Sequence, residues 1–471
     1  MTFKRRTKIV ATLGPASETA ETLDALLAAG VDCFRINCSH GTEEELRRRN
    51  ADARAAIARC GRHVGVLFDL QGPKLRLSAD TPVRVVQADE LVHFVGVGRG
   101  RDDAELVVDY ADFLHLVTER SEIVIGDGVP RFVVEALDDG RVTARALTAG
   151  TVSPRKGVNV TWARPSLPAI TEKDATDLTL AAELGADVVA LSFVRSAADM
   201  EDLRERLSGL GSRARTVAKI EKIEAYEHLD EILEASDGIM VARGDYGVEA
   251  GVARVPLMQK DAINRATQVG KLVITATQML ESMIHAPEPT RAEAADVANA
   301  VIDGTSAVML SAETGVGEFP VQAVKAMAEI AYAAEESPVI LGRARGIHPV
   351  GSAAATVMYA AVQLSDALDS AALLIPTATG GGARACSKYR PARPIVALVH
   401  DDVVGNQLAL EWGVLPLRLP VAETVDELVE ASLRAARDEV GLPSGAGVIL
   451  TAGRRTGTPG ATSLIMVREI P

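Results

Sequence analysis

Short apolar runs alternate with helical patterns at the start of the chain. The run KIVATLG (Lys8 to Gly14) predicts a buried strand. The next segment, SETAETLDALLAAG, places its leucines on one helical face and stops at Gly30, which predicts a helix. The runs CFRINC and VGVLFDL (Val64 to Leu70) predict the second and third strands. This alternation is typical of an α/β fold.

The pattern changes between Lys74 and Lys156. This region has many Val and Thr residues, several turn signals and few helical stretches. Within it, RFVVEALDDGRVTARAL consists of two alternating segments around an Asp-Gly pair, which is typical of a β-hairpin. We therefore expect a separate small β domain, inserted between two elements of the first domain.

Alternation then resumes. A helix is predicted from the cap Thr171 to Gly185, and another from the capping box Thr290 to Glu293 as far as Gly304. Five strand-like runs are interspersed: DVVALSF, TVAKIE, GIMVARGD, LVITATQ and AVML. Three strands before the insertion and five after it make eight, which favours a closed (β/α) barrel. An open sheet stays an alternative on pattern alone.

The region from Gly346 to Pro471 predicts another α/β unit. Its segment AALLIPTATGGGARACSKYRPARPIVALV is typical of a strand, a Gly-rich loop, a helix and a second strand. We expect three domains: a barrel over residues 1–72 and 158–345, an inserted β domain over 73–157, and a C-terminal α/β domain over 346–471.

The bulk composition agrees with several domains and limits the partners. A chain of 471 residues exceeds what one hydrophobic core usually supports. Its apolar content of 47% and charged content of 24% are those of an ordinary globular protein. The net charge of −14 argues against nucleic acid as a partner, although a local basic pocket for phosphates is compatible with it.

The cysteines and the apolar runs bear on the compartment. Cys33, Cys38, Cys60 and Cys386 show no metal-ligand spacing, so we expect free thiols in a reducing compartment. The segment MTFKRRTKIV has no apolar signal region, and no apolar run is long enough to span a bilayer. We expect a cytoplasmic protein without a membrane partner.

Chemically capable residues gather at the predicted strand ends, where such a barrel has its active site. They are Arg35, Asn37, Ser39, His40, Asp69, Lys219, Glu221, Arg243, Gly244, Asp245, Thr275, Thr277 and Gln278. Carboxylates, a lysine and an arginine on one rim suit an Mg²⁺ held by one or two carboxylates and by substrate oxygens. They also suit the stabilisation of a transferring phosphoryl group.

Simpler explanations exist for each residue taken singly. A charge at a strand end is more often a helix cap or part of a surface ion pair. The tripeptide RGD carries little information, and the run Gly380 to Gly382 alone is more typical of a flexible turn. The concentration at strand ends is the evidence for a site, because each simple explanation would have to hold independently.

Segments along nearly the whole chain resemble the signature blocks of the pyruvate kinase family, in the family's order. They are TKIVATLGPAS, FRINCSHG, KGVN, LPAITEKD, AKIE, DGIMVARGDYGVE, ATQMLESM, PTRAEAADVANAVIDG and SKYRP. The resemblance implies a (β/α)8 TIM barrel, an inserted small β-barrel lid and a C-terminal α/β effector domain. It implies transfer of the phosphoryl group of phosphoenolpyruvate to ADP, giving pyruvate and ATP, the last step of glycolysis.

The resemblance also assigns catalytic roles. Lys219 matches the lysine that stabilises the transition state, Arg35 matches the arginine that contacts the phosphoryl group, and Thr277 matches a substrate-binding threonine. Glu221 and Asp245 match the Mg²⁺ ligands, with Mn²⁺ able to substitute. The backbone amides of Gly244 and Asp245 would open a helix that binds the substrate carboxylate.

Nucleotide contacts are implied on both sides of the lid. Arg76 and Lys156 match contacts to nucleotide phosphates, one at each hinge of the inserted domain. That placement fits a lid that closes over the nucleotide and excludes water. Asn37 and His40 match positions where the family approaches ATP.

The chain departs from the family at a monovalent-cation site. Asn37, Ser39 and Asp69 match ligands of a cation that is usually K⁺. The common pattern after the aspartate is Thr-Lys-Gly-Pro-Glu, but this chain has Leu-Gln-Gly-Pro-Lys, ending at Lys74. Family members with this lysine resemble one another in working without K⁺. Our hypothesis is that the ammonium of Lys74 supplies the charge that K⁺ would bring, so that K⁺ is not required.

Smaller departures are Cys38, Tyr246 and Ala312, where Phe, Leu and Gly are usual; none removes a catalytic charge. The C-terminal region resembles the family's effector domain, although its Gly-rich loop is divergent. We expect this loop to bind a phosphorylated effector, a sugar phosphate or a nucleotide. Its residues are Thr377, Thr379, Gly380, Gly381, Gly382 and Arg384. The resemblance further implies a homotetramer.

Two alternatives compete with an active pyruvate kinase. A phosphoenolpyruvate-using aldolase or mutase would need the Mg²⁺ carboxylates but no nucleotide lid, so Arg76 and Lys156 argue against it. A degenerate paralogue that only binds effectors, or regulates a partner subunit, predicts the loss of a catalytic charge. Every catalytic charge implied by the resemblance is present.

Overall fold

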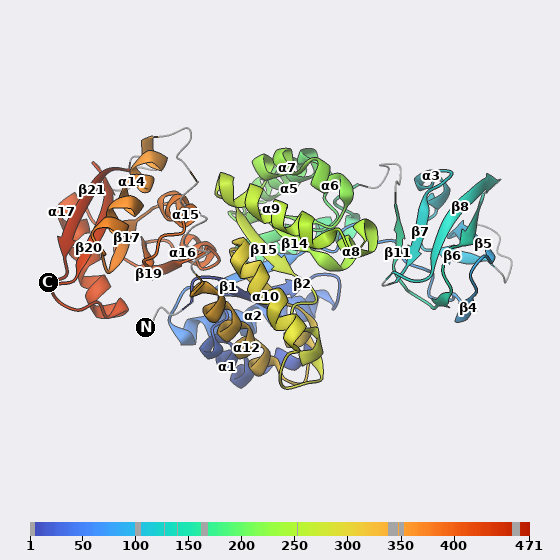
Figure 1. Cartoon of the computed structure of the whole chain (residues 1–471), viewed down its shortest axis with the longest axis horizontal. Coiled ribbons are helices and arrows are strands. Elements are labelled where there is room, and N and C mark those ends of the chain that lie inside the picture. Colours follow the sequence, from blue (N-terminus) through green and yellow to red (C-terminus); the bar gives the residue numbers. More distant parts are fainter. Residues whose placement is uncertain are drawn as a thin grey trace.

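The computed structural model describes residues 5–98, 105–126, 128–138, 140–161, 168–251, 253–337, 347, 353–454 and 462–471. Figure 1 shows three bodies in a row, with the C-terminal α/β body at one end, a barrel in the middle and a β domain at the other end. In these ranges no helix combines the length and the apolar character needed to cross a membrane.

The middle body is a closed barrel of parallel strands, so the open-sheet alternative is excluded. Its order is β1-β16-β15-β14-β13-β12-β3-β2. The bounds are β1 Lys8–Thr12, β2 Cys33–Asn37, β3 Gly65–Asp69, β12 Val188–Leu191, β13 Arg215–Ile220, β14 Gly238–Ala242, β15 Leu272–Ala276 and β16 Ala307–Leu310. The three strands predicted before the insertion and the five after it are confirmed. Because all strands are parallel, their carboxyl ends meet at one rim.

Helices surround the barrel and bury aliphatic faces against it. The longer ones are α1 Ala20–Ala29, α2 Glu43–Cys60, α4 Glu172–Glu183, α5 Ala197–Gly209, α9 Val255–Val269, α10 Arg291–Asp303 and α12 Pro320–Glu335. Shorter elements are η1 Pro15–Ser17, α6 Ile223–Glu227, α7 Leu229–Ala235, α8 Arg243–Ala250, η2 Glu281–Ile284 and α11 Ala312–Gly315. The predicted capping box between Thr290 and Glu293 is confirmed, and Gly30 ends α1 with a left-handed φ of 114°.

The inserted domain contains a six-stranded sheet, β11-β7-β8-β9-β5-β6, and a two-stranded sheet, β10-β4. The bounds are β4 Arg84–Val86, β5 Leu91–Gly96, β6 Leu106–Val108, β7 Glu122–Ile125, β8 Arg131–Asp138, β9 Arg141–Ala146, β10 Gly150–Val152 and β11 Val158–Val160, with α3 at Phe113–Leu116. The predicted hairpin is the antiparallel pair β8–β9. The edge strands β6 and β11 are joined through residues 75–78, where Leu77 bridges to Val108 and Arg76 bridges to Gly157, so the sheet curls round on itself in keeping with the expected small β-barrel.

Two connections join the inserted domain to the barrel. The first turns at Gly72, whose φ is +68°, and a Cβ there would lie 2.9 Å from the backbone oxygen of Ser192. A side chain at this turn is therefore excluded by both conformation and space. The second connection is β11, and an antiparallel bridge between Arg76 and Gly157 pairs the two connections. The inserted domain is therefore joined to the barrel by two chain segments that pair with each other.

The C-terminal body is a five-stranded sheet, β19-β18-β17-β20-β21, in which only β21 is antiparallel to its neighbour. The bounds are α14 Ala353–Ala367, β17 Ala372–Pro376, α15 Gly381–Lys388, β18 Ile395–Val399, α16 Asp402–Leu408, β19 Val414–Arg418, α17 Val425–Ala435, a π-helical turn Ala436–Val440, β20 Gly447–Gly453 and β21 Thr462–Glu469. The predicted order of strand, loop, helix and strand is confirmed. The expected boundary at 345–346 lies outside the described residues.

Buried charges line the contact between the barrel and the C-terminal body. The ammonium of Lys8 donates to the carbonyl of Val414 at 2.7 Å, and Arg215 pairs with Glu411 at 2.5 Å. Lys8 is 5% exposed, and burial lowers its pKa to about 8, although Asp32 opposes the shift. The folded protein therefore gives up this proton more readily than the unfolded chain does.

This burial makes stability depend on pH in a defined window. Between pH 8 and the ordinary lysine pKa of 10.5, the unfolded chain holds the Lys8 proton and the folded protein does not, so stability should rise with pH. Relative to Lys8→Met, the wild type should gain up to about 1.4 kcal/mol per pH unit in that window. Urea denaturation of both proteins from pH 7 to 10 measures the difference, with Lys260→Met as a half-exposed control. A difference that is constant over this range would contradict the shifted pKa.

Candidate active site

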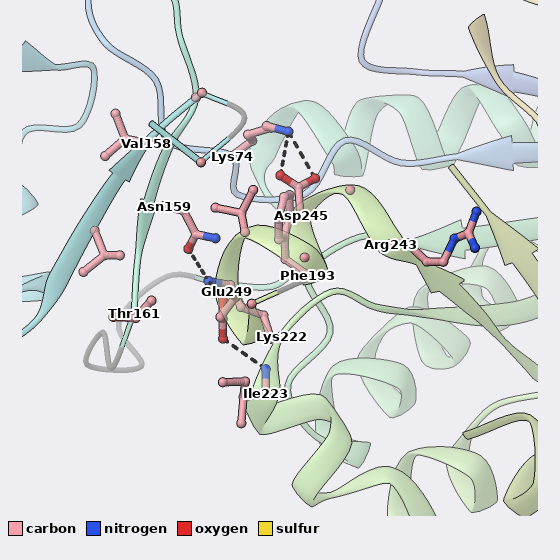
Figure 2. A pocket seen from close by; sticks show the side chains of 18 of the residues that line it. Lys74, Val158, Asn159, Thr161, Phe193, Lys222, Ile223, Arg243, Asp245 and Glu249 are labelled. Carbon is pink, nitrogen blue, oxygen red and sulfur yellow. Dashed lines mark hydrogen bonds and ion pairs between the residues drawn. The ribbon is translucent and has the colours of Figure 1, made fainter. Parts of the chain in front are cut away.

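A cavity of about 1160 Å³ lies between the inserted domain and the carboxyl ends of the barrel strands. Figure 2 shows side chains from both bodies around it. The inserted domain contributes Lys74, Arg76 and Lys156, and the barrel contributes Gly244 and Asp245. Of the strand-end residues singled out in the sequence, Arg243, Gly244, Asp245 and Gln278 line this space and share it with cations of the second domain.

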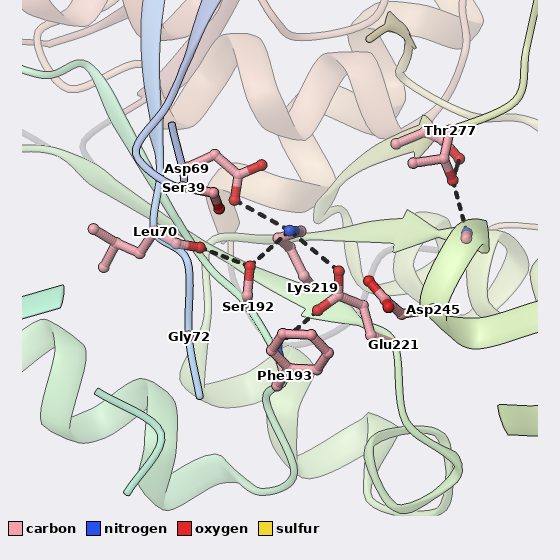
Figure 3. A network of polar contacts seen from close by, with 12 residues as sticks. Ser39, Asp69, Leu70, Gly72, Ser192, Phe193, Lys219, Glu221, Asp245 and Thr277 are labelled. Carbon is pink, nitrogen blue, oxygen red and sulfur yellow. Dashed lines mark hydrogen bonds and ion pairs between the residues drawn. The ribbon is translucent and has the colours of Figure 1, made fainter. Parts of the chain in front are cut away.

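Lys219 is the centre of a buried network at the rim (Figure 3). It stands near the end of β13, and its Nζ lies 3.2 Å from Asp69 Oδ1 and 3.1 Å from Glu221 Oε1. It also donates to the Oγ of Ser192 at 2.6 Å. The Lys219 side chain is 12% exposed, and both carboxylates are more deeply buried. One ammonium thus joins the ends of β3, β12 and β13.

The two carboxylates decide the protonation of Lys219. Burial alone would lower the pKa of its ammonium, but the charges of Asp69 and Glu221 outweigh burial and raise the pKa above its ordinary value. For Asp69, burial would raise the pKa, but Lys219 and Arg35 outweigh it and lower the pKa. Lys219 is therefore a fixed positive charge, and Asp69 is a fixed negative one, at neutral pH.

Arg35 is held by the same aspartate. Its Nε and Nη2 both lie 2.7 Å from Asp69 Oδ2, and its Nη1 donates to Thr12 Oγ1 at 3.0 Å. The register of neighbouring strands explains this contact, because Arg35 and Asp69 lie near the ends of the adjacent strands β2 and β3. Two cations, Arg35 and Lys219, are thus oriented by one buried carboxylate.

Glu221 and Asp245 form a second acidic feature beside Lys219 (Figure 3). Burial and the negative charge of Asp245 raise the pKa of Glu221, although Lys219 opposes them. Glu221 Oε2 accepts a hydrogen bond from the backbone amide of Phe193 at 2.8 Å. The charge of Asp245 thus makes ionisation of Glu221 less favourable, and two carboxylates placed in this way are a donor set suited to a divalent cation. Among the described residues no group of three or more His, Cys, Asp or Glu side chains is placed for a metal, so further ligands would be substrate oxygens or water.

Lys74 reaches Asp245 from the inserted domain. Its Nζ lies 3.0 Å from Oδ1 and 3.2 Å from Oδ2 of that carboxylate. The sequence grouped Lys74 with Asn37, Ser39 and Asp69, but the structure places its ammonium on the other acidic feature. Asp69 is engaged by Arg35 and Lys219 instead.

Thr277 and Gly244 meet at the start of α8. The Thr277 hydroxyl accepts from the Gly244 amide at 2.9 Å and donates to the Ala276 carbonyl at 2.6 Å. Thr277 has a φ of +66°, which is costly for a β-branched residue and marks a position held by its surroundings. Arg243 holds it, because its Nη2 donates to the Thr277 carbonyl at 2.7 Å while its Nη1 pairs with Asp296 at 2.5 Å.

The proposed nucleotide residues are only partly brought together. Arg76 and Lys156 line the cavity, and Arg76 Nη1 donates to the Arg155 carbonyl at 3.3 Å. Asn37 and His40 do not line it; the amide oxygen of Asn37 accepts from the Ser39 backbone at 3.1 Å, and His40 is exposed at the rim. Partial burial and the positive charges of Arg76 and Arg35 lower the pKa of His40.

The Gly-rich loop lies in the C-terminal body, apart from this cavity. The Gly380 amide donates to Thr377 Oγ1 at 3.0 Å, and α15 begins at Gly381. The guanidinium of Arg384 turns back on the loop, where its Nη2 donates to the Thr379 carbonyl at 2.6 Å. Its Nη1 is buried without a hydrogen-bond partner. The loop has the form of a phosphate cradle, but Arg384 binds the loop itself.

Sequence reasoning missed several residues of the site. Ser192 directly follows β12, donates to the Leu70 carbonyl at 2.7 Å and accepts from Lys219. Its position at the carboxyl end of a barrel strand is the same signal that marks the other residues of the site. Lys222 and Asn159 were also missed, and no local pattern marks their contact, which joins the inserted domain to the barrel at 2.9 Å.

The chain is similar to known proteins over nearly its whole length. A family model described as "Pyruvate kinase, barrel domain" matches residues 4–324, and one described as "Pyruvate kinase, alpha/beta domain" matches residues 355–468. The chain is similar to a pyruvate kinase of Geobacillus stearothermophilus, with 40% identity over 99% of this chain and 81% of the relative. It is similar to "Pyruvate kinase 2" of Synechocystis (39%, covering 99% and 79%) and to a pyruvate kinase of Mycobacterium tuberculosis (38%, covering 99% and 98%).

Proposed function

The chain belongs to the pyruvate kinase family, and from this premise we propose how its own residues carry out the reaction. The activity is phosphotransfer, with phosphoenolpyruvate and ADP as the substrates that the family implies and a divalent metal cation as its cofactor. The observation that carries the proposed mechanism is the position of Lys219 between Asp69 and Glu221, because Glu221 interacts electrostatically with Asp245, which lines the cavity shared with the lid.

We assign transition-state stabilisation to Lys219. The phosphoryl group passes from one oxygen to another with negative charge on its own oxygens and on the enolate that leaves. A preorganised cation in a buried site stabilises such charge without reorganising during the reaction. Lys219 has this property because Asp69, Glu221 and Ser192 fix its ammonium from three sides.

Glu221 and Asp245 are the proposed ligands of Mg²⁺, with Mn²⁺ able to substitute. When bound, the metal supplies electrostatic stabilisation to oxygens of the enolate and of the phosphoryl group. The residues of this chain fit that role, because the charge of Asp245 raises the pKa of the buried Glu221 and a shared cation would relieve the repulsion.

The remaining substrate contacts are assigned by position. Arg35, oriented by Asp69, would contact the transferring phosphoryl group. The backbone amides at Gly244 and Asp245, at the start of α8, would bind the substrate carboxylate. Thr277 holds the first of these amides through its hydroxyl and lies where the resemblance places protonation of the enolate.

The inserted domain is proposed to be a nucleotide lid. Arg76 and Lys156 line the cavity from the lid side, where they could bind phosphates of ADP. Asn37 and His40 would approach the nucleotide from the barrel rim. The lid would exclude water from the phosphoryl group during transfer.

Turnover without K⁺ is part of the proposal. The resemblance assigns Asp69 to the cation site, but in this chain Asp69 forms ion pairs with Arg35 and Lys219. The side-chain oxygen of Asn37 accepts a hydrogen bond from the backbone amide of Ser39. The ammonium of Lys74 adds a further positive charge beside Asp245. A monovalent cation nearby would be repelled by these groups.

Regulation and assembly complete the proposal. We assign the loop from Thr377 to Arg384 to a phosphorylated effector, and the start of α15 at Gly381 supports an anion there. A homotetramer stays a proposal drawn from the resemblance. The domain limits 1–72 with 158–345, 73–157 and 346–471 stay proposals drawn from the sequence pattern, although β11 pairs with β7 and so carries the inserted sheet as far as Val160. Allosteric control would require that the effector bind two states of the chain unequally.

Replacing Lys219 by Met tests the central assignment. The variant should lose turnover by about a hundredfold to a thousandfold, because the fixed cation is gone. Binding of Mn²⁺, followed by electron paramagnetic resonance, and the circular dichroism spectrum should stay near those of the wild type. Lys260→Met removes a half-exposed amine that pairs with the buried Asp303 outside the cavity, and it is the matched control. Turnover retained in Lys219→Met would refute the assigned role.

Replacing the salt tests the role of K⁺. In a coupled assay at constant ionic strength, the wild type should keep most of its turnover when K⁺ is exchanged for tetramethylammonium. Lys74→Glu should become dependent on K⁺, because a carboxylate replaces the ammonium beside Asp245. Loss of most wild-type turnover without K⁺ would sink the hypothesis.

A further inference from the structure

Helix α8 is the element on which the lid rests. It carries Asp245, and three contacts join it or its neighbour to the lid. The first is the ion pair of Lys74 with Asp245, and in the second Arg131 Nη2 donates to the Val248 carbonyl at 3.0 Å. The third contact is made by Lys222, to which the proposed mechanism assigns no role. Figure 2 shows it on the side of the cavity away from Lys74.

Lys222 bridges two bodies with one ammonium. Its Nζ donates to Asn159 Oδ1 on lid strand β11 at 2.9 Å and lies 2.6 Å from Glu249 Oε2 on α8. The second oxygen of Glu249 accepts from the backbone amide of Ile223 at 3.0 Å. The Lys222 and Glu249 side chains are 19% and 6% exposed. The bridge is thus largely shielded from water.

Burial makes this bridge stronger than a surface ion pair. A carboxylate as buried as Glu249 requires a compensating cation, and Lys222 supplies it. The hydrogen bond to Asn159 has a charged donor, which strengthens it relative to a neutral one. Breaking that bond moves a partly buried ammonium away from one of its two oxygen partners, so opening of the lid at this point has a cost.

Asn159 transmits the contact to the whole lid sheet. It lies in the middle of β11 and pairs with Val124 on β7. On either side of it, the Val158 amide donates to the Leu75 carbonyl and the Thr161 amide donates to the Glu122 carbonyl. A force on the Asn159 side chain therefore acts on both lid connections and on the sheet behind them.

We infer that Lys222 is a positioning residue that holds the lid over α8 through its hydrogen bond to Asn159. This inference rests on the proposed nucleotide lid. On the barrel side Glu249 fixes the Lys222 ammonium through an ion pair. On the lid side the Asn159 side chain accepts the hydrogen bond from that ammonium. The bond sets where Arg76 and Lys156 stand relative to Asp245. Lys222 touches neither the reacting atoms nor the metal ligands, so its effect falls on nucleotide binding and not on the chemical step.

A purely local role is the competing explanation. Lys222 is the residue at the N-terminal end of α6, and its ammonium neutralises Glu249. Both of these local roles are independent of the lid. Asn159 separates the two explanations, because Asn159→Leu removes the lid partner and leaves the pair of Lys222 with Glu249 intact. This variant also keeps the test decisive if Lys222→Met fails to fold.

The experiment compares Lys222→Met, Lys222→Arg, Asn159→Leu and the double variant Lys222→Met/Asn159→Leu in the full chain. Loss of the charged hydrogen bond should raise the KM for ADP and the calorimetric Kd for MgADP about tenfold in each Met or Leu variant. The kcat should change by less than about twofold, since the catalytic charges are untouched. The double variant should be no worse than either single one, and Lys222→Arg should restore most of the affinity.

Hydrogen exchange gives a readout that does not depend on turnover. The amides of Val158 and Thr161 should exchange faster in Lys222→Met and Asn159→Leu alike, and Lys260→Met should leave them unchanged. Additive effects in the double variant, or an Asn159→Leu protein with wild-type affinity and exchange, would overturn the inference. A wild type that makes no ATP from phosphoenolpyruvate and ADP would instead overturn the proposed function and leave the exchange result to stand.

Discussion

The structure depends on one buried charge, the ammonium of Lys219, held between Asp69 and Glu221. A lysine this deeply buried would lose its proton if it stood alone, because burial disfavours the charged form. The two carboxylates reverse that outcome, and Asp69 in turn is kept ionised by Lys219 and Arg35. The barrel makes this arrangement possible, because its parallel strands bring charges from distant parts of the sequence to one rim.

Helix α8 connects this charge cluster to the lid. Its first turn carries Asp245 beside Glu221, and the Gly244 amide in that turn is held by Thr277, whose own backbone is strained. The lid meets the same helix through Lys74 at one end and Arg131 at the other. Any movement of the lid therefore acts on the element that presents a metal ligand and substrate-binding amides. Chemistry and nucleotide binding are linked through this single short helix.

Periodicity and capping signals predicted the fold well, because they are local. The eight barrel strands, the Thr290 capping box and the hairpin β8–β9 all follow from patterns within a few residues. The rule that active-site residues stand at the carboxyl ends of barrel strands correctly located Lys219 and Glu221 at the end of β13. Contacts between distant segments were not predictable in this way: Lys74 and Asp245 are 171 positions apart, and the sequence associated Lys74 with Asp69 instead. The direction in which a long side chain turns, as with Lys74 or Arg384, is decided by tertiary packing.

The pKa of Lys219 is the measurement that tests this account most directly. Competitive acylation across pH 7 to 11, followed by mass spectrometry, reports the pKa of a single lysine in the wild type and in Asp69→Asn. The wild-type value should lie above the ordinary lysine pKa of 10.5, and the variant's pKa should be lower than the wild type's, because one of the two carboxylates that outweigh burial is neutralised. Asp24→Asn, at an exposed pair with Arg59, is the matched control. Equal pKa values in the wild type and Asp69→Asn would contradict the claim that Asp69 keeps Lys219 charged.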